Sequence, residues 1–223
     1  MLGVVLPFLG PFLAGRGLGA VAVGLVTAAF SLAKLAYAPF LGRWVDRGGW
    51  IPAMLSVHVV FSLVAALVVV GARNPWVLGA AFLAVGLGYG TVLPLVEAAV
   101  LERPPVKGYG FVRWWGSVGF IAFAGLSAVM LRGGQLDGFP LLMIGSLVAL
   151  GLVTVTLEDE AKPRRSGESS LRVTGSVWVL LVILTMQQVS HGPYYAFFSI
   201  HLDEHGISTG AVATLWSLAV LAE

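Results

Sequence analysis

Three charged residues stand inside long apolar stretches of this chain: Glu97, Arg113 and Lys34. Placing an ion at membrane depth costs about 2.5–3.5 kcal/mol on insertion scales, so such residues usually face a protein interior or a water-filled path. A carboxylate in such a place can take up and release a proton, and a cation favours an anionic or hydroxyl-rich ligand. We therefore expect the functional site of this protein to lie inside its apolar segments.

Glu97 ends a stripe of small residues. Gly86, Gly90, Pro94 and Glu97 are four, four and three residues apart, which places them on one face of a helix. Small residues allow helices to approach closely and Pro94 frees a carbonyl group, so this face is expected to be packed or to line a cavity. The alternative is that Glu97 extends to the membrane surface or pairs with Arg103.

Arg113 begins a second stripe, which runs through Phe120 on the next apolar stretch. A guanidinium group suits a carboxylate, whether that carboxylate belongs to Glu97 or to a bound solute. Consecutive helices joined by a short loop usually pack side by side, so the sequence predicts a Glu97–Arg113 pair. The alternative is an interfacial arginine held beside the two tryptophans that follow it.

A third polar stripe lies on the stretch 176–200, where Gln187, His191 and Tyr194 share one face and Tyr195 lies on an overlapping one. Polar groups at membrane depth need partners, and a histidine can accept a proton near neutral pH. The predicted role is substrate binding. The alternatives are hydrogen bonding between helices or an aromatic belt at the membrane surface.

Lys34 shares a helix face with Thr27 and Ser31, which favours a polar cavity over an extended side chain at the membrane surface. His58 stands alone on an apolar stretch and is interpreted as structural. Residues 201–205 contain two histidines and two acids and are predicted to form a solvated loop rather than a metal site.

The elements that hold these residues are predicted from composition. The chain is 58% hydrophobic and 11% charged, against about 25% charged residues in soluble domains. Its mean hydropathy is +0.92. Apolar runs of about 20 residues indicate membrane-spanning helices rather than barrel strands, so we predict an all-α polytopic membrane bundle. The net charge of +2 argues against nucleic-acid binding, and the absence of cysteine excludes disulfides and thiol catalysis.

Eight apolar stretches are predicted to be helices. The first is too short to cross a bilayer, and the last stops in mid-pattern, so we expect the chain to be a piece of a longer protein, cut at both ends. The predicted stretches are 1–13, 19–41, 51–71, 76–101, 109–131, 139–157, 176–200 and 207–223.

The loops predict orientation and domain boundaries. One set of loops carries eight Lys and Arg residues and the opposite set carries three, Arg16, Arg73 and Arg132. The richer set is therefore placed in the cytoplasm, for a multi-pass protein of the cytoplasmic membrane. The polar stretch 158–175 is predicted to be a cytoplasmic linker between an N-terminal bundle, 1–157, and the start of a second bundle, 176–223.

The sequence GRWVDRGG at residues 42–49 resembles the Gly-x-x-x-Asp-Arg/Lys-x-Gly signature of the major facilitator superfamily. The resemblance implies that Gly42, Asp46 and Arg47 form a conformational latch. It also implies the major facilitator fold, with this chain supplying the N-terminal six-helix half and the start of the C-terminal half.

The chain is similar, over its whole length, to the phenylpropionic acid transporter subfamily, which is related to the lactose permease group of proton symporters. The resemblance implies a substrate role for Arg113, a partner role for Glu97, and proton coupling at Glu97 or Glu223. The resemblance is carried by Lys34 and by GVVLPF at 3–8, LPLVE at 93–97, YGFVRWWGSVGF at 109–120, SHGPYYAFF at 190–198 and WSLAVLAE at 216–223.

The expected function is that of a secondary transporter, a proton symporter that moves a small organic solute such as an aromatic acid by alternating access. Candidate substrate-binding residues are Arg113, Lys34, Phe120, Gln187, His191, Tyr194 and Tyr195. The alternatives are a sugar or nucleoside symporter and a non-transporting membrane receptor or scaffold. The chain has no nucleotide-binding loop and no nucleophile–base pair at membrane depth, so we expect neither an enzyme nor a cofactor. The expected partners are the solute, protons and the lipid bilayer, and the full-length protein is expected to be a monomer.

Overall fold

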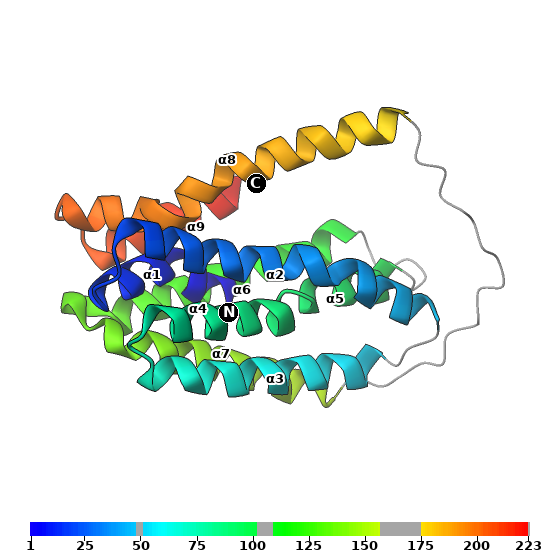
Figure 1. The fold of residues 1–223 in the computed structure, drawn as a ribbon, viewed down its shortest axis with the longest axis horizontal. Helices are drawn as coiled ribbons and strands as arrows, with labels where there is room; N and C mark the ends of the chain where they lie inside the picture. The colour runs from blue at the N-terminus through cyan, green and yellow to red at the C-terminus, as the bar shows by residue number, and fades with distance from the viewer. Residues whose placement is uncertain (48–50, 102–108, 157–174, 223) are drawn as a thin grey trace.

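The computed structural model describes residues 1–47, 51–101, 109–156 and 175–222 (Figure 1). Within these ranges the chain is helical, which confirms the all-α prediction. Most of the predicted linker, 158–174, lies outside the described residues. The elements are α1 (Leu2–Gly15), α2 (Ala20–Asp46), α3 (Ile51–Gly71), α4 (Pro75–Tyr89), α5 (Val92–Leu101), α6 (Tyr109–Met130), the short 3-10 turns η1 (Arg132–Gly134) and η2 (Leu136–Gly138), α7 (Phe139–Thr154), α8 (Gly175–Glu204) and α9 (Thr209–Ala222).

Membrane-spanning character is clearest in three segments of the described chain. By length and composition, Ile51–Gly71, Pro75–Glu97 and Leu136–Thr154 are long and apolar enough to cross a bilayer. The helices run roughly lengthwise, so the bundle has two ends (Figure 1). The "Arg16 end" carries the turns at 16–19, 72–74, 131–138 and 205–208, and the "Ile51 end" lies opposite, where α2 ends and α3 begins.

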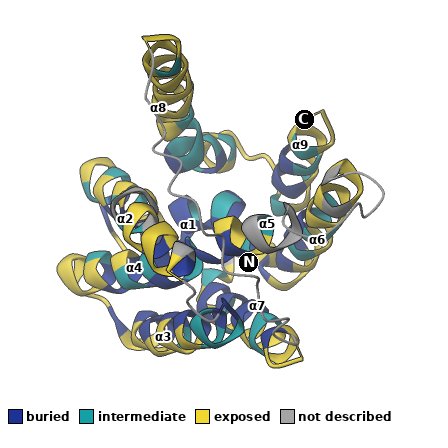
Figure 2. Ribbon diagram, turned by 90° about the vertical axis from the view of Figure 1, so that its right-hand side faces the viewer, coloured by how far each residue is buried: buried dark blue, intermediate teal, exposed yellow. Residues whose placement is uncertain are grey.

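Helix α1 lies at the centre of the bundle. Viewed along the bundle, α2, α4, α3, α7 and α6 surround it, with α8 and α9 on one side (Figure 2). It contacts α2, α6, α7 and α8, and most of its residues are buried. The ring of Phe139 in α7 stacks on Phe12 of α1 at 4.7 Å between centroids and lies 6.4 Å from Phe82 of α4. Because lipid tails are as apolar as these side chains, close packing rather than water exclusion holds such contacts together.

The predicted stretch 76–101 is divided into α4 and α5, which corrects the sequence expectation of a single helix. The break lies at Gly90 and Thr91, one turn before Pro94. Proline has no amide hydrogen to donate to the carbonyl of Gly90, and its ring crowds that carbonyl, so the helix is interrupted there. The Thr91 hydroxyl donates to the carbonyl of Gly88 at 2.7 Å and is buried, which satisfies one group that the break releases.

Helix α8 extends to Glu204, so the prediction of a loop over 201–205 is wrong for its first four residues. The helix ends where Gly206 adopts a φ of +72°. The amide of Gly206 donates to the carbonyl of Asp203, and that of Ile207 donates to the carbonyl of Leu202, at 2.9 and 3.0 Å. This is a Schellman end, which needs a residue that tolerates the left-handed region. Among the described residues there is no group of three metal-binding side chains.

Arg16 joins three elements at its end of the bundle. Its guanidinium donates to the carbonyl of Ala72 at 2.8 Å and to that of Val70 at 3.5 Å, pairs with Asp137 at 3.4 Å, and lies 4.9 Å over the ring of Phe12. The last carbonyls of a helix have no partner within the helix, and a cation also complements the negative end of the helix dipole. Arg16 therefore caps α3 and clamps it to α1 and to the turn between α6 and α7.

Close helix crossings occur at glycines. A Cβ atom added at Gly86 of α4 would overlap the backbone carbonyl of Phe30 in α2, and one at Gly3 of α1 would overlap the carbonyl of Phe120 in α6. At Gly10 of α1 it would lie 2.5 Å from the carbonyl of Ala196 in α8. Only glycine permits these approaches, because backbone atoms cannot move aside as a side chain can.

We predict that Gly86→Ala destabilises the protein and that Gly79→Ala on the same helix does not. The new methyl group at position 86 must displace the backbone of Phe30 and meets Ala33 at 3.1 Å, whereas at position 79 the nearest atom is a methyl carbon of Val26 at 3.8 Å. Overpacking of this kind costs about 1–3 kcal/mol. Thermal unfolding of the purified protein in detergent measures the difference. Equal melting temperatures for the two variants would show that the α2–α4 crossing is not tightly packed.

Candidate functional site

Helices α8 and α9 together form an aromatic cluster, made up of Tyr194, Tyr195, Phe198 and Trp216. The ring centroids of the three α8 residues lie 4.8, 5.9 and 6.0 Å from the Trp216 ring. The indole nitrogen of Trp216 donates to the hydroxyl oxygen of Ser199 at 2.9 Å, and both residues are buried. A buried tryptophan usually finds an acceptor for its N–H, and here that acceptor fixes the ring against α8.

His191 extends the aromatic cluster along α8. Its ring lies 5.6 Å from that of Tyr195, and its Nδ1 lies 2.8 Å from the carbonyl of Gln187. In the neutral ring, Nδ1 then carries the proton and Nε2 is the acceptor. The structure thus brings together His191, Tyr194 and Tyr195. Gln187 contributes its backbone carbonyl, while its side chain is exposed. Their role in substrate binding stays a prediction.

The two α6 candidates lie in different environments. Arg113 is exposed in the first turns of α6, beside Trp114 and Trp115, whose rings make an edge-to-face contact at 5.5 Å and are also exposed. Phe120 is buried in the core, and its carbonyl faces Gly3 of α1. Arg113 is therefore accessible to a solute in this structure, whereas Phe120 packs between helices.

The predicted Glu97–Arg113 ion pair is not formed. Glu97 is half-buried in α5, but among the side chains that the structure describes the ion pair joins Arg16 to Asp137. The reason lies in helix packing, because α6 packs mainly against α9 and α1 rather than against α5. Sequence neighbourhood alone therefore misplaced this pair.

The remaining candidates are only partly described. The side chains of Lys34 and Asp46 and the whole of Glu223 lie outside the described residues. Gly42 and Arg47 of the latch motif are exposed near the end of α2, and the amide of Arg47 donates to the carbonyl of Arg43 at 3.3 Å. The motif thus lies at the Ile51 end of the bundle.

Helix α8 touches the first bundle near the Arg16 end and diverges from it toward the Ile51 end (Figure 1). Ala196 meets Gly10 of α1, and the ring of Phe197 lies 3.6 Å from a Cβ built at Gly24 of α2. In contrast, residues 178–190 of α8 are all exposed. No described element covers the face that carries Gln187, and the aromatic cluster lies next to the end where α8 meets α1 and α2.

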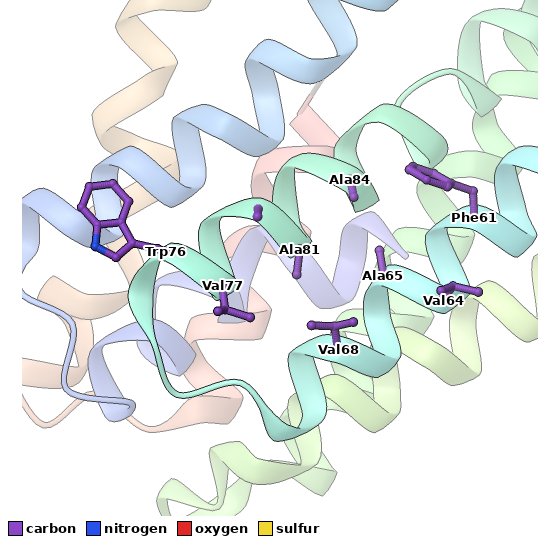
Figure 3. A pocket seen from close by; sticks show the side chains of 9 residues that line it. Phe61, Val64, Ala65, Val68, Trp76, Val77, Ala81 and Ala84 are labelled. Carbon is purple, nitrogen blue, oxygen red and sulfur yellow. The ribbon is translucent and has the colours of Figure 1, made fainter.

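One groove in the structure, of about 500 Å³, lies elsewhere (Figure 3). It runs between α3 and α4 and is lined by apolar side chains, among them Phe61, Val64 and Trp76. It lacks the few polar groups that orient a solute in a binding pocket, so it is not the site of the predicted chemistry.

Sequence reasoning assigned no role to Ser199 or Trp216. The two are 17 residues apart, on different helices, so no helical periodicity connects them. The signal that could have found them is the tryptophan itself, because its N–H needs an acceptor at membrane depth and Ser199 is the hydroxyl facing it.

Comparison with known proteins agrees with this architecture. The MFS_1 like family matches residues 1–223. The probable 3-phenylpropionic acid transporter of Escherichia coli (strain K12) is 28% identical over 236 residues, which cover 99% of this chain and 61% of that protein. The quinolone resistance protein NorA of Staphylococcus aureus is 27% identical over 197 residues, covering 83% and 50%. Multidrug resistance protein 2 of Bacillus subtilis (strain 168) is 27% identical over 225 residues, covering 97% and 54%.

A solved structure has the same fold. The nucleoside transporter NupG matches with a TM-score of 0.79 at 15% identity, over 98% of this chain and 60% of that one. This match confirms the predicted major facilitator fold. The chain spans between 50% and 61% of the length of the curated relatives named above. They are named as transporters or resistance proteins, in agreement with the prediction that the chain is not an enzyme.

The match of the family over all 223 residues, the shared fold and the apolar helices lead to one conclusion. The chain is a multi-pass membrane protein that belongs to the MFS_1-like family of the major facilitator superfamily.

Proposed function

We propose that this chain is part of a secondary transporter that moves a small organic solute across the cytoplasmic membrane by alternating access. The observation that carries the proposal is the contact pattern of α8, which packs on α1 and α2 near the Arg16 end and is exposed along 178–190. Two bundles that rock about a contact at one end, and part at the other, give a solute access from one side at a time.

The side that is open follows from the loop charges. Arg43 and Arg47, the members of the richer loop set that the structure describes, lie at the Ile51 end, and the rule for loop charges places that end in the cytoplasm. The arrangement then corresponds to an inward-facing state. In this state Arg113 and the Gln187 face of α8 are exposed, and the aromatic cluster lies near the closed outer end.

The proposed solute is an aromatic acid. Tyr194 and Tyr195, which are half-buried and held against the buried Trp216, offer rings for an aromatic group, and an exposed Arg113 offers a guanidinium fork for a carboxylate. Lys34 is proposed as a second cation. The 28% identity to the probable 3-phenylpropionic acid transporter supports this class. The ring faces suit a nucleobase equally, so a nucleoside is the second candidate.

Coupling to protons is proposed at Glu97, with Glu223 as the alternative. Glu97 lies in α5 just after the helix break at 90–91, half-buried in an apolar segment. A carboxylate there can be neutral in one conformational state and ionised in another, because its exposure to water changes as the bundles rock.

The proposal is tested by uptake into proteoliposomes that contain the full-length protein. We expect labelled phenylpropionate to be accumulated when a proton gradient is imposed, and to compete with other aromatic acids but not with sugars. Competition by nucleosides alone would support the second candidate. Binding of the acids with no movement across the membrane would support a receptor and would contradict transport.

We predict that Ser199→Ala raises the KM for an aromatic acid about tenfold. The change leaves the buried indole N–H of Trp216 without its acceptor, at a cost of about 1–3 kcal/mol, and lets the ring move out of the aromatic cluster. The control is Ser127→Ala in α6, a buried serine whose hydroxyl donates only to the carbonyl of Phe123, at 2.7 Å. An equal change of KM in both variants would show that the Ser199 hydroxyl has no specific role in solute binding.

We predict that Glu97→Gln abolishes accumulation driven by a proton gradient but preserves exchange of labelled for unlabelled solute. The amide cannot carry a proton, whereas exchange needs only the movement of the loaded protein. Glu204→Gln is the control, because Glu204 is exposed in the last turn of α8. Accumulation at the wild-type level in Glu97→Gln would contradict proton coupling at Glu97 and would favour Glu223 as the coupling residue.

A further inference from the structure

The apolar groove between α3 and α4 is open along one side and is lined by large and small side chains (Figure 3). Its walls are large side chains, Phe61, Val64 and Val68 of α3 and Trp76 and Val77 of α4. Its floor is made of alanines, Ala65 and Ala81 among them, which are buried where the two helices meet. The groove exists because small residues occupy the positions at which larger ones would fill it.

The groove is about as long as one membrane leaflet is thick. Along α4 it runs from Trp76 to Ala84, and eight residues at 1.5 Å each give about 12 Å. Half of a hydrocarbon core of about 30 Å is about 15 Å. It begins beside the turn at 72–74, at the Arg16 end, and ends near the middle of the bundle. A single acyl chain of one leaflet therefore matches it in length.

No element that the structure describes covers the groove. Both of its helices belong to the described segments that are long and apolar enough to cross a bilayer. The elements of the second bundle pack elsewhere, α8 on α1 and α2 and α9 on α6. Figure 2 shows α3 and α4 on the side of the bundle away from α8 and α9.

The turn that leads into α4 at the Arg16 end of the groove carries a cation, and the first groove residue of α4 is an aromatic ring. Arg73 lies in the turn between α3 and α4, is exposed, and makes no hydrogen bond or ion pair with the other described residues. Trp76 is 82% exposed at the same end, where tryptophan rings settle among lipid headgroups. Asn74 accepts from the amides of Trp76 and Val77, so these amides of α4 are already satisfied and Arg73 is the group left to bind an anion.

We propose that this groove binds one acyl chain of an anionic phospholipid, with the lipid phosphate at Arg73. The occupant follows from the combination of an apolar groove about as long as one leaflet is thick, its exposure and the positive charge of Arg73 in the adjoining turn. The site is independent of the solute site, because the groove and the aromatic cluster lie on different helices.

The test is native mass spectrometry of the full-length protein in detergent, with dioleoyl phosphatidylglycerol or dioleoyl phosphatidylcholine added. We expect phosphatidylglycerol to be retained at least fivefold more strongly than phosphatidylcholine. Ala80→Phe, which fills the groove, is expected to lose one bound lipid, and the control Leu83→Phe, outside the lining of the same helix, to keep it. Equal retention by these two variants would overturn the site.

The charge of Arg73 is tested separately. Arg73→Gln is expected to remove the preference for phosphatidylglycerol, whereas Arg132→Gln, an exposed arginine in another turn at the same end, is expected to keep it. Loss of the preference in both variants would overturn the role of Arg73. If Ala80→Phe does not fold, brominated phosphatidylglycerol provides the second measurement. The fluorescence of Trp76 is obtained as the difference between wild type and Trp76→Phe, and bromine in the groove should quench it. Trp76 fluorescence that the brominated lipid does not quench would overturn the proposal.

Discussion

Backbone-to-backbone contact at glycines is the constraint on which this bundle depends. Gly3 and Gly10 are seven residues apart, two turns of α1, and they bring the backbones of α6 and α8 against the central helix. In lipid, helices gain little from hiding apolar surface and associate through such close packing. Because α1 contacts both α6 and α8, its glycines determine how closely these two helices can approach it.

The aromatic cluster depends on the same contact. Ala196 and Ser199 lie three residues apart on one face of α8, and the first meets Gly10 of α1 while the second accepts from Trp216 of α9. Any movement of α8 relative to α1 therefore moves Tyr194 and Tyr195, whereas Trp216 lies on α9, which packs mainly on α6. If the proposed site is occupied, a solute at the cluster would lie next to the contact between α8 and α1.

The helices and their order could be predicted from sequence, because the length of an apolar stretch and the glycines and prolines at its ends are local signals. The failures have physical causes. The end of α8 was placed too early because the charges at 201–204 resemble a loop, although Gly206 supplies the actual stop. The Glu97–Arg113 pair failed because helix neighbours in space need not be neighbours in sequence, and the Ser199–Trp216 hydrogen bond was missed for the same reason. Such contacts depend on how the helices cross in space, and the periodicity of a sequence carries no information about that.

The contacts of Arg16 stiffen the end of the bundle at which they lie. It fixes α1, α3 and the α6–α7 turn to one another at the end where α8 is attached, so bending there is resisted and rotation is favoured. Helix α2 has 27 residues, so its length is about 40 Å at 1.5 Å per residue. A turn of about a tenth of a radian at the clamped end would then displace the far end by about 4 Å. A small rotation at the clamped end would therefore be amplified along the length of α2.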